Sequence, residues 1–378
     1  MRIGVLEWAS CFGRESLGNG LPETLRVEGW AMCRAALRSL IAAGYQAVAA
    51  VDATLTSDPL LECYRPEQLQ LFKTTSWEST YAACDATLVI APESDGILAG
   101  ILGACERAAI TTCNAHGGFL ATASDKLATA QAWQRASVAH PPTSSLADAQ
   151  DFSKQPGLWV VKRRSGAGCE GMRRLNSAQC NAFRSEQVAT ASAADWIVQP
   201  WLEGRAYSRA AIFDHSGVAH WLPVTSQDLA TSSVIRYRGG TVHPGFDQKI
   251  PGLQSVLLRA GESLGSGRLG WVGFDFLVHG EPHISNLHRP SAHRSCNSPR
   301  NPISASSHSD VGEQGSYGRA LTVIEVNPRL TTSFVGLSAA GAPDLAGAIV
   351  AACLGGPIAL PESWQAVQFT AAGEIQSD

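Results

Sequence analysis

The stretch Trp159–Gly171 reads WVVKRRSGAGCEG, in which an apolar strand ends in a lysine and a glycine-rich loop follows after Arg-Arg-Ser. A lysine beside such a loop suits a triphosphate, because its ammonium reaches phosphate oxygens while backbone N–H groups without side chains close over them. Lys162, Gly166, Gly168 and Gly171 are therefore candidate phosphate-binding residues. The alternative is a simple hairpin loop that carries surface charge.

The same glycines match the Gly-x-Gly-x-x-Gly pattern of dinucleotide-binding proteins, which leaves a nicotinamide-dependent dehydrogenase as a rival interpretation. That pattern should open a helix directly after the first strand of a βαβ unit, with an acidic residue about 20 positions later. Here the loop lies in mid-chain, and charged residues separate it from its strand. The chain has no Gly-Lys-Ser/Thr, so the P-loop arrangement is absent as well.

A second segment, Ile197–Gly204, is an apolar strand that ends in a polar residue and a turn. Its backbone could meet the edge of an adenine ring. Pro200 lacks an N–H group but keeps its carbonyl acceptor, so the donor must come from a neighbour such as Leu202. The competing interpretation is that this segment is an ordinary strand of the hydrophobic core.

A third group of oxygen donors lies near the end of the chain. Glu325 and Asn327 are two residues apart on a predicted strand, so their side chains point to one face, and Asp275 on a neighbouring strand could join them. Such a set suits Mg²⁺, which is usually held by one or two carboxylates plus substrate phosphates. Arg329 is close enough to bind a phosphate or a carboxylate. A solvated face with an ion pair is the alternative, although the apolar flanks make unpaired carboxylates costly.

The apolar pattern predicts two α/β regions. The first has strands at 3–7, 47–51 and 86–90 and a helix over 25–43 that Gly44 ends. The second opens with a helix to about Val138, which Ser124 could cap and whose positive end Asp125 favours. Its predicted strands are 158–162, 196–199, 210–213, 220–224, 271–278 and 321–326. Residues 279–319 lose this periodicity and predict a flexible insertion, and its histidines (His283, His288, His293, His308) leave a metal site as the lesser alternative.

Composition limits the function classes. The chain has 378 residues, 45% of them hydrophobic and 16% charged, with a net charge of -4, which predicts a soluble protein of two or three domains. This charge does not imply a nucleic acid partner. Glu7 and Trp8 interrupt any signal peptide, the apolar segment 341–360 fits a short buried helix better than a membrane span, and ten scattered cysteines fit reduced thiols. We expect a cytoplasmic protein without a membrane partner; a homodimer is left open.

Together these motifs resemble the ATP-grasp superfamily in the order that the family uses. The members of the set are an N-terminal α/β domain, Asp125-Lys126, Lys162 with its glycine loop, the 199–204 hinge, and Asp275, Glu325 and Asn327. The resemblance implies an α/β protein, α+β in its nucleotide-binding part. The expected domains are a Rossmann-like pre-ATP-grasp domain (1–118), a small ATP-grasp subdomain with the glycine-rich loop (119–200), and a C-terminal subdomain with the metal site and an insertion near 280–319 (201–378).

The resemblance also implies roles for single residues. Lys126, Lys162 and the loop glycines would contact ATP phosphates, and Asp275, Glu325 and Asn327 would hold Mg²⁺ (or Mn²⁺). Lys162 and Arg329 would stabilise charge during catalysis. The adenine-binding set would be Gln199, Trp201, Leu202 and Glu203, and Glu203 could replace an acidic ribose ligand that the family often has where this chain has Ala206.

The implied activity is that of an ADP-forming ligase that joins small-molecule carboxylate and amine substrates into an amide through an acyl-phosphate. Another ATP-grasp ligase for amino acids or cofactor precursors is the nearest alternative. A non-catalytic nucleotide-binding protein is disfavoured because both lysines and the full metal set are present.

A narrower resemblance is to the tyramine-glutamate ligase family of methanofuran biosynthesis. It is carried by Leu6-Glu7-Trp8, Leu21-Pro22-Glu23-Thr24-Leu25, Glu28-Gly29, Tyr237-Arg238-Gly239-Gly240 and the run from Asn327 to Ser333. Glutamate joined to tyramine or tyrosine is the implied reaction, although the insertion separates Asp275 from Glu325 by more than is usual. The substrate-pocket candidates, with core or surface roles equally open, are Glu7, Glu28, Arg236 and Tyr237. His243 is either a base or a loop histidine with a hydrogen-bonding role.

Overall fold

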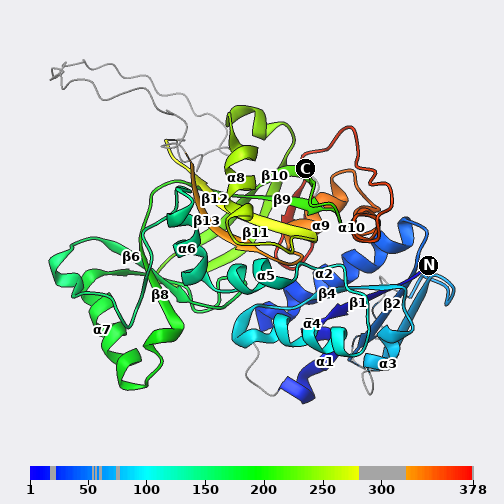
Figure 1. The fold of residues 1–378 in the computed structure, drawn as a ribbon, viewed down its shortest axis with the longest axis horizontal. Coiled ribbons are helices and arrows are strands. Elements are labelled where there is room, and N and C mark those ends of the chain that lie inside the picture. The colour runs from blue at the N-terminus through cyan, green and yellow to red at the C-terminus, as the bar shows by residue number, and fades with distance from the viewer. Residues whose placement is uncertain are drawn as a thin grey trace, which may run out of the picture.

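The structure is a computed structural model that describes residues 1–17, 23–52, 55, 58, 62–73, 77–280 and 321–376. It contains three sheets (Figure 1). The predicted insertion at 280–319, with its four histidines, lies outside the described residues apart from Gly280. No helix in the described ranges is long and apolar enough to cross a membrane.

The N-terminal sheet is parallel, with the strand order β3-β2-β1-β4. Its strands are β1 (Arg2–Glu7), β2 (Gln46–Val51), β3 (Leu69–Lys73) and β4 (Ala86–Ile90). β1, β2 and β4 are almost continuously buried, because a parallel sheet is covered on both faces, and their apolar runs made them predictable. β3 was not predicted, since its sequence LQLFK alternates polar and apolar residues.

The helix α2 (Glu23–Ala42) packs between this sheet and two C-terminal helices, α9 (Ser333–Ala339) and α10 (Leu345–Leu354) (Figure 1). One hydrophobic core therefore runs from the N-terminal sheet through α2 into the C-terminal part of the chain. The Ser39 hydroxyl of α2 accepts a hydrogen bond of 2.8 Å from the Ala346 N–H group of α10. This helix thus joins parts of the chain that are about 300 residues apart.

The second sheet is antiparallel, has the order β5-β8-β6-β7, and encloses a separate core with helix α7. Its elements are β5 (Ser144–Ser145), β6 (Leu158–Arg163), β7 (Arg173–Asn176), α7 (Ser177–Ala189) and β8 (Trp196–Pro200). The glycine loop connects β6 to its antiparallel neighbour β7. The loop is therefore part of a hairpin, so the dinucleotide-fingerprint interpretation is wrong.

Helix α6 (Lys126–Arg135) begins one residue later than predicted from a cap at Ser124. The Asp125 carboxylate accepts hydrogen bonds from the N–H groups of Leu127 and Ala128, so Asp125 is the cap rather than Ser124. Arg164 holds the same carboxylate through two contacts of 2.9 and 2.6 Å. The helix N-terminus is thereby tied to the strand that leads into the glycine loop.

The third sheet has seven strands in the order β13-β12-β9-β10-β11-β14-β15, all antiparallel to their neighbours. The strands are β9 (Arg205–Phe213), β10 (Ala219–Thr231), β11 (Ile235–His243), β12 (Gly270–Val278), β13 (Leu321–Asn327), β14 (Gln368–Thr370) and β15 (Ile375–Gln376). Most were predicted, with shorter bounds, but β11, β14 and β15 were not. In β12 the side chains of Val272, Phe274, Phe276 and Val278 belong to one core, and Asp275 lies on the other face of the strand, paired with Glu325 of β13.

The remaining helices surround these sheets. They are α1 (Trp8–Leu17), α3 (Trp77–Ala82), α4 (Ile97–Arg107), α5 (Gly117–Ala123) and α8 (Leu253–Glu262), with short 3-10 turns at Ser94–Gly96, Phe152–Lys154, Ala193–Asp195 and Phe246–Lys249. α10 is the buried helix predicted within 341–360. Figure 1 places the small sheet with α7 at one end of the molecule and the N-terminal sheet at the other.

Candidate functional site

A cavity of about 960 Å³ lies where the three sheets meet, and most of the site residues predicted from the sequence line it, whereas Gly171, Arg236 and His243 do not. The carboxyl ends of β1 and β4 and one face of α2 close one side. The glycine loop and the end of β8 close another, and the seven-stranded sheet forms the floor. Such a cavity is large enough for a nucleotide and a second small molecule.

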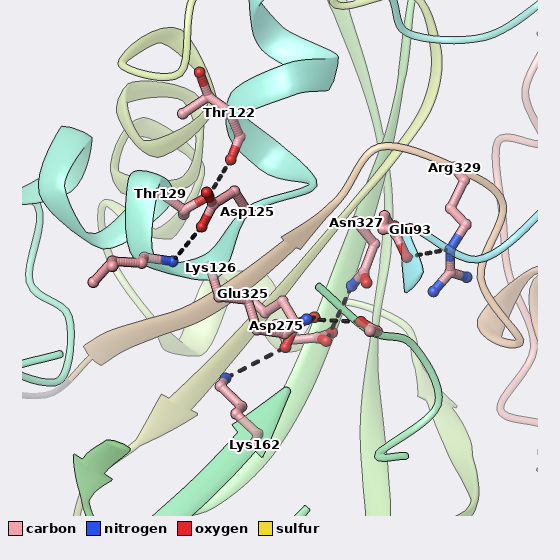
Figure 2. Close-up of polar contacts among 12 residues, drawn as sticks. Glu93, Thr122, Asp125, Lys126, Thr129, Lys162, Asp275, Glu325, Asn327 and Arg329 are labelled. Carbon is pink, nitrogen blue, oxygen red and sulfur yellow. Dashed lines mark hydrogen bonds and ion pairs between the residues drawn. The ribbon is translucent and has the colours of Figure 1, made fainter. Parts of the chain in front are cut away.

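Two lysines from different elements meet at one carboxylate (Figure 2). Lys126, the first residue of α6, places its Nζ 3.0 Å from Glu325 Oε1, and Lys162 near the end of β6 places its Nζ 3.4 Å from Glu325 Oε2. The Lys126 ammonium also donates a hydrogen bond of 2.7 Å to the Gly166 carbonyl. Both lysine side chains are largely buried, at 12% and 5% exposed, so a positive charge is concentrated beneath the glycine loop.

Asp275 lies directly opposite Glu325 in the pairing of β12 with β13, and Asn327 is two residues further along the same strand. The Asn327 amide donates to Asp275 Oδ2 at 3.1 Å, and the Gln227 amide donates to Asp275 Oδ1 at 3.0 Å. The structure thus brings together the three residues predicted to hold a metal. Gln227 was missed, because nothing in its local sequence indicates that β10 reaches this site.

Burial and neighbouring charges together determine the pKa values of these groups. Burial and, second to it, the neighbouring charge of Glu325 raise the pKa of Asp275 to about 6, against hydrogen bonds that lower it. Burial also raises the pKa of Glu325, but the two ammonium groups outweigh it, so that the net shift is downward. Burial lowers the pKa of Lys162, against the attraction of Glu325. Glu325 is therefore the group held in its charged form.

The oxygen donors fit a divalent cation shared with phosphates. The carboxylates of Asp275 and Glu325 lie on paired residues, and a cation between them would offset their mutual repulsion. The Asn327 amide nitrogen donates to Asp275, so the amide oxygen of Asn327 remains as a further metal ligand. Within the described ranges no group of three His, Cys, Asp or Glu side chains has an arrangement that could hold a metal ion. The set is too small to enclose a metal by itself, as expected where nucleotide phosphates complete the coordination.

The glycine loop depends on backbone conformations that side chains disfavour. Gly168 and Gly171 have φ of +61° and +67°, and Cys169 between them has φ of +59°. A Cβ atom on Gly168 would lie 3.1 Å from Leu25 Cδ2, and one on Gly171 would lie 3.0 Å from the Trp196 ring. Glycine is therefore required for this close approach of the loop to its neighbours.

The predicted adenine segment also lines the cavity. Gln199, Trp201, Leu202 and Glu203 all contribute to the wall. The Gln199 amide donates to the Thr143 hydroxyl at 2.8 Å, and the Trp201 N–H group donates to the Leu158 carbonyl at 2.8 Å. Glu203 Oε1 accepts a hydrogen bond of 2.7 Å from Trp201 Nε1, so its carboxylate is fixed at the edge of the cavity. Ala206, whose side chain has no oxygen to offer a ribose, lines the same cavity.

Arg329 lies beside the oxygen donors (Figure 2). Its Nε donates to Glu93 Oε2 at 3.0 Å, and its Nη1 donates to the Leu330 carbonyl at 3.1 Å. Both partners of the Arg329–Glu93 ion pair are below 10% exposed. Glu93 was missed by sequence reasoning because 236 residues separate it from Arg329.

Three of the four substrate-pocket candidates, Glu7, Glu28 and Tyr237, line the cavity. Arg236 is exposed on the strand and is not part of the wall, whereas its neighbour Arg238 is. His243 also lies outside the wall, and its Nε2 is 2.9 Å from the Ser226 hydroxyl. The geometry therefore favours the hydrogen-bonding interpretation of that histidine.

With this geometry in place, comparison with known proteins identifies the domains. Residues 45–116 match the family model of the pre ATP-grasp 3 domain, and residues 123–287 match that of an ATP-grasp domain. The chain contains an ATP-grasp domain preceded by a pre-ATP-grasp domain. The predicted fold class is confirmed, including the parallel N-terminal sheet, whereas no comparison specifically supports the tyramine-glutamate ligase resemblance.

Solved ATP-grasp structures share this fold across nearly the whole chain. An ATP-grasp superfamily protein of Archaeoglobus fulgidus has 20% identity and a TM-score of 0.63, over 97% of this chain and 92% of that one. Biotin carboxylase of Campylobacter jejuni has 18% identity and a TM-score of 0.61, over 96% and 73%. D-alanine–D-alanine ligase of Bacillus anthracis has 14% identity and a TM-score of 0.56, over 93% and 97%. The search of curated proteins finds no match.

Proposed function

We propose that this ATP-grasp protein is a carboxylate–amine ligase that forms an amide through an acyl-phosphate and releases ADP and phosphate. One observation carries the proposal: Lys126 and Lys162 converge from separate elements on Glu325, beside Asp275 and Asn327, inside a cavity closed by a glycine loop. A cationic pocket next to paired carboxylates is what a magnesium–triphosphate complex needs.

Each group has a role that follows from its position. Lys126 and Lys162 would exchange their contacts with Glu325 for contacts with phosphate oxygens, and the loop N–H groups would cover the same phosphates. Asp275, Glu325 and Asn327 would hold Mg²⁺, which neutralises phosphate charge when bound. Arg329, already oriented by Glu93, would bind the substrate carboxylate or the transferred phosphoryl group.

A carboxylate is a poor electrophile, and phosphorylation by ATP gives it a leaving group that an amine can displace. The protein needs no nucleophile of its own for this reaction. Its contribution is to position the substrates and to stabilise charge. The relatives named above for their fold include a D-alanine–D-alanine ligase, and an L-amino acid ligase from Bacillus licheniformis shares it as well, which supports this reaction class.

For the substrates, we propose glutamate as the carboxylate and tyramine or tyrosine as the amine, in a methanofuran-type cofactor pathway of the cytoplasm. The residues around Glu28 and Tyr237 that carry this resemblance lie in the cavity wall, which supports the narrower proposal. We also propose the domain bounds 1–118, 119–200 and 201–378, each of which encloses one of the three sheets.

The test is ADP release from ATP and Mg²⁺ with glutamate and a panel of amines that includes tyramine and tyrosine, with products resolved by mass. An amine-dependent increase in ADP together with a new amide is the expected result. If ATP binds but no carboxylate and amine pair is turned over, the ligase proposal fails while the nucleotide site stands.

A further inference from the structure

One buried carboxylate in the cavity wall has neither a hydrogen-bond donor nor a salt-bridge partner among the described residues. The buried acidic residues of the wall are Glu7, Glu28, Asp275 and Glu325. Glu7 accepts hydrogen bonds from the N–H groups of Ala9 and Ser10, and the two others are held by the amides and lysines already described. Glu28 is 8% exposed, and within the described part of the chain no hydrogen-bond donor meets its carboxylate.

Helix α2 determines what surrounds this carboxylate. Leu25, Glu28, Gly29 and Met32 are spaced as one face of a helix, and all four line the cavity. Glu28 is the only charged residue of that face, with an apolar side chain on either side. No larger residue fits in place of Gly29, because its Cβ atom would collide with the Glu7 carboxylate. The face suits a ligand with an apolar body and one positive charge.

The Glu28 carboxylate lies beside the glycine loop. A Cβ atom on Gly168 would be 3.6 Å from Glu28 Oε2, so the carboxylate borders the region where the loop would cover phosphates. An uncompensated carboxylate beside this loop would repel the phosphoryl groups that the loop covers. A cation placed between them would offset the repulsion, and Glu28 and Arg329 line the same cavity.

We propose that Glu28 binds the ammonium group of the amine substrate and accepts its proton, so that the pocket selects primary amines carried on an apolar body. The proposal rests on the ligase function proposed above. The charged and titratable groups that face Glu28 are Arg329, Tyr237 and Cys169. Burial raises the pKa of Glu28 to about 7 against the attraction of Arg329, which is suitable for a proton acceptor near neutral pH.

The proton and electron balance is complete without another reactant. The ammonium transfers one proton to the Glu28 carboxylate and becomes a neutral amine. The amine nitrogen forms a C–N bond to the acyl carbon, and the C–O bond to phosphate breaks with its electron pair on the phosphate oxygen. The second proton of the nitrogen leaves with the phosphate, and Glu28 releases its proton to solvent before the next turnover.

The binding step is tested without turnover, with tyramine as the probe and its neutral alcohol analogue, 2-(4-hydroxyphenyl)ethanol, as the comparison. By calorimetry we expect the wild-type protein to bind tyramine about tenfold or more tightly than the alcohol, as a charge-assisted contact requires. In Glu28→Gln this preference should disappear. The preference should persist in the control Glu106→Gln, which changes an exposed carboxylate of α4 in the same domain.

The catalytic step is tested by trapping the acyl-phosphate with hydroxylamine. Glu28→Gln should form hydroxamate from glutamate and ATP as the wild type does, but should lose about 100-fold or more in amide formation with tyramine. Loss of both products together, or an altered Mg²⁺ requirement, would assign Glu28 to the phosphate side and overturn the proposal. So would an equal preference of wild type and variant for tyramine.

These measurements separate the two proposals. Without ATP-dependent hydroxamate in the wild type, the ligase reaction with glutamate fails, whereas a Glu28-dependent preference for tyramine would still support the ammonium site. With hydroxamate formed but no such preference, the ligase stands and the role of Glu28 falls. Misfolding is excluded by comparing the unfolding midpoints of wild type and variant, since Glu28→Gln removes no hydrogen bond in the described part of the chain.

Discussion

Glu28→Gln should stabilise the protein at alkaline pH even though it removes a functional group. Burial, opposed by Arg329, raises the pKa of Glu28 from 4.5 to about 7 in the folded state. A folded-state pKa above the unfolded value means that the protonated group favours folding. The contribution is fully present below about pH 4.5 and is lost as the pH rises through about 7.

The size of the effect follows from these values. At about 1.4 kcal/mol per pH unit, a rise from 4.5 to about 7 corresponds to about 3 kcal/mol of destabilisation when Glu28 is ionised. Glutamine does not titrate, so its own desolvation cost is the same at every pH. The difference in unfolding free energy between variant and wild type should therefore grow in favour of the variant by up to about 3 kcal/mol between about pH 4 and pH 8.

Urea unfolding followed by tryptophan fluorescence and circular dichroism measures this difference, provided that both signals give one transition. The control Glu106→Gln, at an exposed position of α4, should stay within about 0.5 kcal/mol of the wild type at both pH values. A gap between Glu28→Gln and wild type that stays constant with pH, or that closes as the pH rises, would show that Glu28 has no elevated pKa. A variant that is more stable and less active would show that this carboxylate is maintained for function at the expense of stability.

The phosphate side of the cavity leads to three further predictions. Glu325→Gln should lower the unfolding free energy, measured by urea unfolding without ATP, by about 3 kcal/mol, because Lys162, at 5% exposed, loses its charged partner. Gly168→Ala should weaken ATP binding measured by calorimetry by about 1 kcal/mol, because its φ of +61° and a Cβ contact of 3.1 Å with Leu25 strain the loop, whereas Gly157→Ala, with no atom within 4 Å, should bind ATP normally. Removal of Mg²⁺ with EDTA should abolish ADP release and leave tyramine binding unchanged, and ADP release that survives the chelator would contradict the assigned metal site.

The elements that the sequence predicted are those whose signal is local. β1, β2 and β4 are continuous apolar runs, and the lysine and glycines around Lys162 follow each other along the chain. The spacing of Glu325 and Asn327 was enough to place both on one face of a strand. These features depend on residues that are close together in the sequence, so the sequence alone is enough to predict them.

The elements that were missed depend on distant partners. β11 reads IRYRGGTVH, whose charged residues and paired glycines argue against a strand. The structure explains the glycines: a Cβ atom on Gly240 would lie almost on the Ser226 carbonyl, and one on Gly239 would collide with the Phe369 carbonyl. The glycines allow β11 to fit between β10 and a strand more than a hundred residues later. No local pattern indicates that requirement.

The cores of the molecule determine which parts of the cavity can move. The core around α2 is continuous from the N-terminal sheet to α10, so the wall that contains Glu28 is packed against the C-terminal part of the chain. The small sheet, in contrast, has a core of its own within residues 146–198. A displacement of this sheet exposes little apolar surface of the larger core, and it moves the glycine loop while Glu28, Asp275 and Glu325 keep their relative positions. We therefore expect the glycine loop and its sheet to move when the nucleotide enters, while the proposed amine site keeps its geometry on the opposite wall.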